Sequence, residues 1–438
     1  MSVPRTTRFS PGCVACVVAA TALGGAANGQ IAVDEAAALR SYYSGNGLLN
    51  RGMYDLAAQE YRRFLEDHPD HLKATLARYG LAVSLFRSGN YAPAVQQLEA
   101  LGTPDDFEYA AEVLVITGQS RLVLGDPARA AEAFGQVLRE HPEHGLADEA
   151  AALHAEALYE ARRFEEVERP CRLLATRWPD SPHRERAELF GGLAQLARGR
   201  FAAAAERFDA MIAMYPDGDH ADRVVLLRAQ SLHRAERVPD AVAGYRDVIR
   251  RARDEFVPDA MYGLAVLLNM TRRHAEAGTV LDGLLRRYPD DDVVPAAQLM
   301  RGRVWFDVEQ YERAGEVFEE LSRQDGDYRD DAAYWSAKSM LRRGDASGAA
   351  RALEQALANF PDSELVPQMT YDRAVALLGA GEPGVAITVL EESGPRHRST
   401  TSPPTPCNSR PRRTISSAGT ARASPAARRF TGAIPATS

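Results

Sequence analysis

Four histidines form two pairs in matching sequence contexts. His68 and His71 surround a Pro-Asp dipeptide, and His141 and His144 surround a Pro-Glu dipeptide. Paired imidazoles could bind a metal ion, but structural zinc needs a fuller set of closely spaced Cys and His ligands, which is absent here. Both pairs fall at expected helix ends in the same phase of a repeat, where polar or cationic side chains suit the helix dipole. We therefore expect solvated helix-end histidines and no metal site.

The other reactive side chains also have structural interpretations. Cys171 occupies a repeat position held elsewhere by Phe134 and Phe208, which predicts a small buried hydrophobic residue rather than a nucleophile. The acidic cluster Asp290–Asp292 falls in an expected loop, where solvated turn residues are common. The sequence has no phosphate-binding glycine loop, no nucleophile elbow and no carboxylate pair in an expected pocket. These observations predict a protein that is not an enzyme and that uses no cofactor or small-molecule substrate.

An internal repeat positions all of these residues. Each unit has one position that opens its second expected helix, and successive positions are separated by 35 to 37 residues. A period of this length is typical of stacked helical hairpins. The ten positions are Tyr54, Tyr91, Pro127, Phe164, Phe201, Val238, His274, Tyr311, Ala346 and Pro383.

The positions around each opening residue follow the requirements of close helix packing. Nine residues earlier every unit has glycine or alanine, and seven residues later it has a large apolar residue or Cys171. A small residue lets two helices approach, and the large residue fills the space toward the next hairpin. Proline after the second helix, as at Pro216, prevents its continuation. Glycine before the opening position, as at Gly199, favours a tight turn.

The order of small residue, Gly, Tyr, Ala, Phe and Pro at these spacings resembles the tetratricopeptide repeat. The resemblance covers about Ala37 to Gly394 and implies an all-α, right-handed solenoid of about ten hairpins that binds proteins. Its helix-ending phrases (YPDG at Tyr215, FPDS at Phe360) are similar to those of bacterial envelope members. Those members include the outer-membrane-protein assembly lipoprotein D family and the periplasmic coordinator of the Tol-Pal system.

The resemblance also implies a binding surface, because in this family the first helix of each hairpin lines a concave groove. Aromatic anchors mixed with amides and cations suit the recognition of peptide segments. Packing between hairpins is an alternative role for several of the tyrosines. The candidate groove residues are Tyr79, Tyr159, Gln230, Tyr262, Asn269, Arg303, Phe306, Tyr334 and Lys338.

The N-terminus has the pattern of an export signal. Arg5 and Arg8 precede an apolar and small-residue stretch, and cleavage before Gln30 would remove residues 1–29. This pattern predicts a periplasmic or cell-envelope protein. An unstructured leader and a lipid anchor on Cys16 are the alternatives.

Residues 395–438 differ in composition from the repeat array of residues 30–394. They contain eight arginines and no acidic residue, and they are rich in Pro, Ser, Thr and Ala. Such a segment cannot bury enough apolar surface to fold alone, which predicts a disordered tail. Translation out of frame and binding of an anionic polymer are alternative explanations. Without the tail and the two leader arginines, 42 basic and 60 acidic residues remain, a net charge of −18 that disfavours nucleic-acid binding.

Together these features predict a non-catalytic scaffold of the bacterial cell envelope that binds peptide segments or helices of other proteins. Any membrane association would be peripheral and through a partner. Two alternatives remain: a self-associating structural array, and the accessory repeat region of a larger enzyme.

Overall fold

The computed structural model of this chain describes residues 27–102 and 107–392, and for residues 27–38 it describes the backbone alone. The predicted tail 395–438 and nearly all of the predicted leader 1–29 lie outside the described residues. Every regular element within the described residues is helical: twenty α-helices and one short 3₁₀ helix. The all-α expectation of stacked helical hairpins is confirmed.

The chain divides into two compact units between Gly199 and Arg200. In the first unit each helix packs against the next helix along the chain. Its helices are α1 (Ala27–Asn50), α2 (Tyr54–Asp67), α3 (Ala74–Arg87), α4 (Tyr91–Leu101), α5 (Ala110–Val123), α6 (Pro127–Glu140), α7 (Ala147–Glu160), α8 (Glu168–Arg177) and α9 (Arg184–Ala197).

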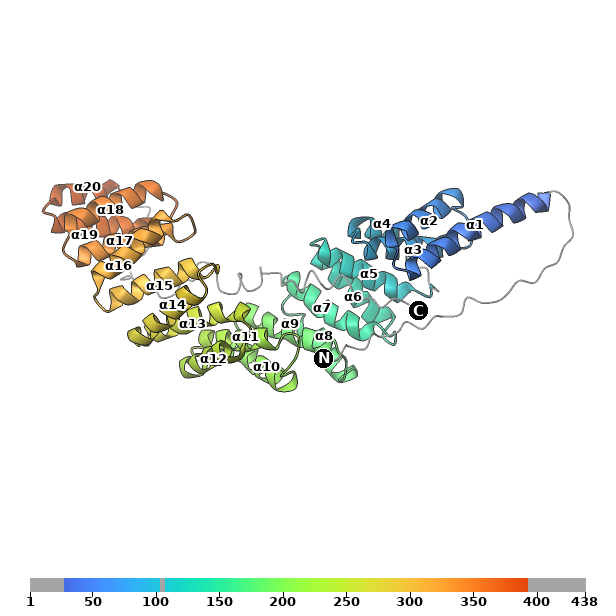
Figure 1. Cartoon of the computed structure of the whole chain (residues 1–438), viewed down its shortest axis with the longest axis horizontal. Coiled ribbons are helices and arrows are strands. Elements are labelled where there is room, and N and C mark those ends of the chain that lie inside the picture. Colours follow the sequence, from blue (N-terminus) through green and yellow to red (C-terminus); the bar gives the residue numbers. More distant parts are fainter. Residues whose placement is uncertain (1–26, 103–106, 393–438) are drawn as a thin grey trace. The chain divides into compact units, whose positions relative to one another are not determined.

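The second unit repeats the same arrangement, with successive helices side by side (Figure 1). A 3₁₀ turn, Asp254–Phe256, precedes α13. The helices are α10 (Phe201–Met214), α11 (Ala221–Arg234), α12 (Val238–Arg251), α13 (Val257–Met270), α14 (His274–Arg287), α15 (Val294–Asp307), α16 (Tyr311–Arg323), α17 (Arg329–Arg342), α18 (Ala346–Asn359), α19 (Val366–Gly379) and α20 (Pro383–Glu392).

First helices also contact the first helices of neighbouring hairpins within each unit. These contacts join α1, α3, α5, α7 and α9 in the first unit, and α11, α13, α15, α17 and α19 in the second. Each unit therefore has a continuous surface built from first helices, which we call its first-helix face. Side chains on this surface are held by neighbouring helices as well as by their own.

Large side chains packed on small residues form the core between hairpins. Tyr61 on α2 is buried between Gly45 of its own hairpin and Gly80 of the next. An added Cβ would lie 2.9 Å from the Tyr61 ring at residue 45 and 2.5 Å from it at residue 80. Real Cβ atoms do not approach so closely, so only glycine fits at these two positions. The predicted pairing of small and large repeat positions is therefore observed as direct contact.

The turn between the two helices of each hairpin requires a left-handed residue. Glycine supplies it at six positions, among them Gly125 (φ 76°) and Gly344 (φ 86°). Four other hairpins place an ordinary residue in the same conformation, with φ between 58° and 62°. These residues are Arg162, Glu236, Arg272 and Glu309. The sequence therefore identifies the turn, but four turns carry backbone strain that glycine would avoid.

One predicted helix start is wrong. The repeat period places the start of α8 at Phe164, whereas the helix begins at Glu168. Pro170 explains the difference, because proline has no N–H to donate to the carbonyl of Glu166. The Glu166 carbonyl instead accepts a hydrogen bond of 3.1 Å from the Arg169 N–H, which is the tighter spacing of a turn.

The histidine pairs lie at helix ends, as predicted. His68 and His141 are the C-cap residues of α2 and α6, and their backbone N–H groups donate to the last turns. All four rings are half-buried rather than solvated, which corrects that part of the prediction. Cys171 is buried, and its Sγ lies 3.1 Å from the Ala187 carbonyl oxygen, as expected for a structural cysteine.

Among the described helices, none is long and apolar enough to span a membrane.

Candidate functional site

The first-helix face of the second unit brings aromatic and cationic side chains together. Tyr262 lies half-buried on α13, where burial raises its pKa to about 12 and the nearby Arg303 guanidinium opposes that rise. Arg303 comes from α15, and its Cζ lies 5.1 Å from the centre of the Trp335 ring on α17. Three consecutive first helices therefore contribute to one cluster, and a cation over an indole face is a favourable contact.

Lys338 extends this cluster along α17. Its Nζ lies 5.1 Å from the centre of the Trp335 ring and donates to the Tyr334 hydroxyl at 3.1 Å. Tyr334 in turn donates to Asp372 Oδ2 at 2.8 Å, which ties α17 to α19. We call Tyr262, Arg303, Trp335 and Lys338 the cation–aromatic cluster. Its side chains are held in place by one another before any partner arrives.

Two of the candidate groove aromatics are buried instead of being available on the surface. Phe306 packs against Tyr311 and Trp335, with ring centres 5.1 and 5.2 Å apart. Tyr334 is buried beside Trp335, and its hydroxyl is engaged by Asp372. The contacts of Phe306 and Tyr334 therefore match the alternative role, packing between hairpins.

Asn269 is buried and joins three helices. Its Nδ2 donates to Asp307 Oδ2 at 2.8 Å, and its Oδ1 lies 2.8 Å from Nδ1 of His274. Both ends of the amide are therefore occupied by groups of this chain. Gln230 is half-buried on α11, in the repeat position that Arg303 and Lys338 occupy in their own hairpins.

Both candidate tyrosines of the first unit lie in aromatic clusters. The Tyr79 ring stacks on Tyr109 with centres 4.8 Å apart, and burial raises the pKa of its hydroxyl. The Tyr159 ring lies 5.5 Å from Phe164 and 5.6 Å from Phe190. Tyr79 and Tyr159 are half-buried, so each keeps part of its surface accessible.

Carboxylates on the first-helix face of the first unit were missed by the sequence reasoning. Glu149 on α7 accepts from Gln119 Nε2 at 3.2 Å, and Glu156, two turns along the same helix, pairs with Arg186 on α9. Burial raises the pKa of both carboxyl groups, and the Arg186 charge opposes the rise. Glu156 stands in the repeat position of Arg303, so the repeat register was the signal that could have identified it.

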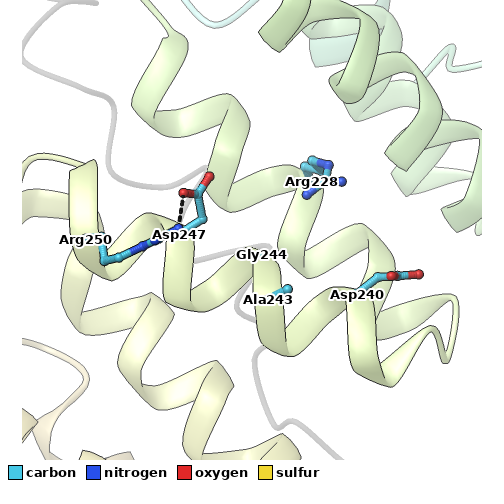
Figure 2. Close-up of a pocket in the computed structure, with 6 residues that line it drawn as sticks. All are labelled: Arg228, Asp240, Ala243, Gly244, Asp247 and Arg250. Atoms are coloured by element: carbon cyan, nitrogen blue, oxygen red, sulfur yellow. Dashed lines mark hydrogen bonds and ion pairs between the residues drawn. The ribbon is translucent and has the colours of Figure 1, made fainter.

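A shallow depression of about 270 Å³ lies between α11 and α12 of the second unit (Figure 2). Figure 2 shows that α12 supplies most of its lining: Asp240, Ala243, Gly244, Asp247 and Arg250, facing Arg228 of α11. Each charged lining residue already has an ionic partner: Arg228 pairs with Asp209, Arg250 with Asp247 and Asp240 with Arg237. We assign it no catalytic role. In the described part of the chain no group of three or more His, Cys, Asp or Glu side chains could hold a metal ion.

Comparison with known proteins identifies one family. A model described as "Tetratricopeptide repeat" matches residues 42–106, 117–182, 191–254, 226–292 and 336–393, which together exceed half of the chain. No curated protein sequence matches the chain significantly.

Solved structures of related architecture are also similar. A tetratricopeptide repeat protein from Parabacteroides merdae is 15% identical over 69% of this chain and 98% of its own, with a TM-score of 0.40. The anaphase-promoting-complex assembly Cut9–Hcn1 is 16% identical over 81% of this chain and 72% of its own (TM-score 0.39). MamA from Desulfovibrio magneticus is 17% identical over 42% of this chain and 99% of its own (TM-score 0.35).

Proposed function

Because the chain belongs to the tetratricopeptide repeat family, we propose that it is a non-catalytic scaffold that binds segments of partner proteins on its first-helix faces. Tetratricopeptide repeats generally mediate protein–protein interaction. Stacked repeats provide extended surfaces suited to such binding.

One observation carries this proposal: the first helices of each unit contact one another and hold aromatic, amide and charged side chains in fixed positions. The cation–aromatic cluster is the clearest example, because Arg303 and Lys338 both lie about 5 Å from the Trp335 ring. Binding to such a surface costs less side-chain entropy than binding to a surface whose side chains become ordered only in the complex. Aromatic and arginine side chains are also the residue types that contribute most to interface energies.

The proposed setting is the bacterial cell envelope, after export to the periplasm. Its support is the pattern of residues 1–29 and the similarity of the helix-ending phrases to envelope members of the family. Cell fractionation of the full chain, with N-terminal sequencing of the mature protein, tests this setting. A mature protein that begins near Gln30 in the periplasmic fraction supports export, and an intact leader in the cytosol contradicts it.

A crosslinking pull-down from envelope fractions tests partner binding. The full chain serves as bait beside two variants. One is the double variant Tyr262→Ala/Arg303→Ala, and the other is the single variant Arg250→Ala. Arg250 is an exposed arginine on the second helix α12, so it controls for loss of positive charge away from the first-helix face. A defined partner set should survive Arg250→Ala and disappear in the double variant. The same partners on all three baits would place binding elsewhere.

Self-association is a second candidate function, favoured by one specific surface. Leu390 on α20 is 45% exposed, whereas its repeat equivalents Phe318 and Leu353 are 0% and 1% exposed. Tyr371 on α19 is 61% exposed. These side chains give the last hairpin exposed apolar surface, and exposed apolar patches often mark contacts between proteins. Sedimentation over a concentration series, with Leu390→Glu as control, separates an assembling chain from a monomer.

A further inference from the structure

In five of the loops between hairpins, a side chain at the same repeat position forms a hydrogen bond with the backbone. The residue lies 17 positions after the opening residue of the second helix, and its side chain accepts from the backbone N–H of the residue two positions later. That N–H belongs in each case to the N-cap residue of the next first helix. The five bonds are His71 Nδ1 to Lys73 N–H (3.0 Å), His144 Nδ1 to Leu146 N–H (3.2 Å), Ser181 Oγ to His183 N–H (3.1 Å), Asp291 Oδ1 to Val293 N–H (3.0 Å) and Ser363 Oγ to Leu365 N–H (3.1 Å).

Two of these five acceptors are imidazole nitrogens, and both lie in the first unit. A ring nitrogen accepts a hydrogen bond only while it is unprotonated. In His71 and His144 the proton of the neutral ring is therefore on Nε2. Protonation would place a second N–H on Nδ1, facing the backbone N–H that it now binds. The hydroxyl acceptors Ser181 and Ser363 gain no charge in the same range.

From this geometry we propose that acidification breaks the side-chain hydrogen bonds in the α2–α3 and α6–α7 loops and so increases local opening there. The loops with a serine acceptor, at Ser181 and Ser363, keep their hydrogen bonds. Histidine is the side chain that ordinarily takes up its proton between pH 5 and 8. A hydrogen-bonded acceptor becomes a second donor, so the junction loses a bond and gains repulsion. The N–H of the next helix's N-cap residue is then left without its acceptor.

The surroundings of the two rings differ. His71 stands edge-on to the Phe64 ring, with centres 5.3 Å apart. His144 Nε2 lies 3.6 Å from Glu112 Oε1 on α5. At both junctions the Nδ1 atom is the acceptor, so protonation removes the same hydrogen bond from each. The charged and titratable groups next to the rings are His68, Asp70 and Lys73 at His71, with Lys73 Nζ 5.8 Å from the centre of the Tyr42 ring, and Glu112, His141 and Glu143 at His144.

Hydrogen exchange measured by mass spectrometry on the full chain tests the proposal. Protection of the peptide spanning residues 67–76 is compared at about pH 7.5 and about pH 5.5, after correction for intrinsic exchange. The expected loss is about fivefold, the usual effect of losing one hydrogen bond. The peptide spanning 141–149 should also lose protection, and those spanning 178–186 and 360–368 should not change relative to the rest of the chain.

The variant His71→Asn keeps a side-chain acceptor without a titratable ring, and it should abolish the acid effect on peptide 67–76 alone. If asparagine disturbs folding, His71→Ser reproduces the arrangement at Ser181. An undiminished acid effect in the substituted protein would overturn the proposal. An equal loss of protection in the loops with a serine acceptor would overturn it as well, because acid would then act on the array as a whole.

Discussion

Gly118 on α5 lies directly against the Phe134 ring on α6, so that a Cβ at residue 118 would lie 2.6 Å from two ring carbons. Phe134 is fully buried, and it cannot move without opening the contact between the two helices. Close approach of glycine and a large ring recurs at Gly263 with Tyr245, which shows that the repeat depends on this contact rather than on helix propensity.

The first prediction is that Gly118→Ala destabilises the protein. Alanine improves helix propensity by about 1 kcal/mol, but overpacking of a filled core costs about 1–3 kcal/mol, so we expect a net loss. Gly145→Ala is the control, because nothing lies within 4 Å of a Cβ at that position. Thermal unfolding followed by circular dichroism measures both. A Gly118→Ala protein as stable as the parent would show that the ring shifts without cost.

Turn residues with positive φ provide the second prediction. Arg162 is exposed and has φ 60°, a conformation that an L-residue adopts at a cost. Arg162→Gly should therefore stabilise the chain by about 0.5–1 kcal/mol, despite the greater freedom of glycine in the unfolded state. Gly344→Ala, at φ 86° in the equivalent turn, should destabilise it. Chemical denaturation of the two variants should give shifts of opposite sign, and shifts of the same sign would contradict the strain argument.

Pro170 gives the third prediction. Pro170→Ala supplies the N–H that an α-helical bond to the Glu166 carbonyl requires, in place of the tighter bond from Arg169, so α8 should begin at Phe164 as in the other hairpins. Pro170 is the third residue of α8, in the first turn where proline is tolerated, and it would be interior only in a helix that began at Phe164. Helical content by far-ultraviolet circular dichroism should therefore rise, while the midpoint of thermal unfolding should change little because the added turn offsets the packing lost from this buried ring. Pro127→Ala is the matched control, since proline at the first position of α6 is tolerated and its removal should change little.

The fourth prediction concerns His154, whose pKa is lowered from 6.5 to about 4, first by burial and then by the positive charge of Arg163. Because the folded pKa lies below the unfolded value, the unfolded chain binds more protons between these two pH values. His154 therefore favours folding above about pH 6.5, and that stability is lost as the pH falls toward 4. The loss is on the order of 2–3 kcal/mol.

Comparing unfolding free energies of the parent and of His154→Leu across this pH range measures the effect. The two curves should run parallel above about pH 6.5, and the parent should lose more stability than the variant as the pH falls from there toward 4. Curves that stay parallel over the whole range would show that protonation of His154 is not coupled to folding.

The sequence alone determined the repeat register, the hairpin boundaries and the small-to-large packing, because these depend on residue types at fixed spacings along one or two neighbouring helices. The starts of α2, α4 and α16 fall at the predicted opening residues for this reason. The later start of α8 could also have been predicted from the sequence, since Pro170 is a local signal. The prediction followed the repeat period instead and placed the start at Phe164.

Only the tertiary structure decided which groove candidates remain accessible. Phe306 and Arg303 lie one turn apart on α15, yet Phe306 is buried against Trp335 of the following hairpin while Arg303 stays half-buried over the same ring. The hydrogen bonds of Asn269 to neighbouring helices, and that of His71 to the Lys73 N–H, likewise depend on backbone geometry that a linear pattern does not contain. Burial is set by the angle at which successive hairpins stack, which is a property of pairs of helices rather than of any one segment.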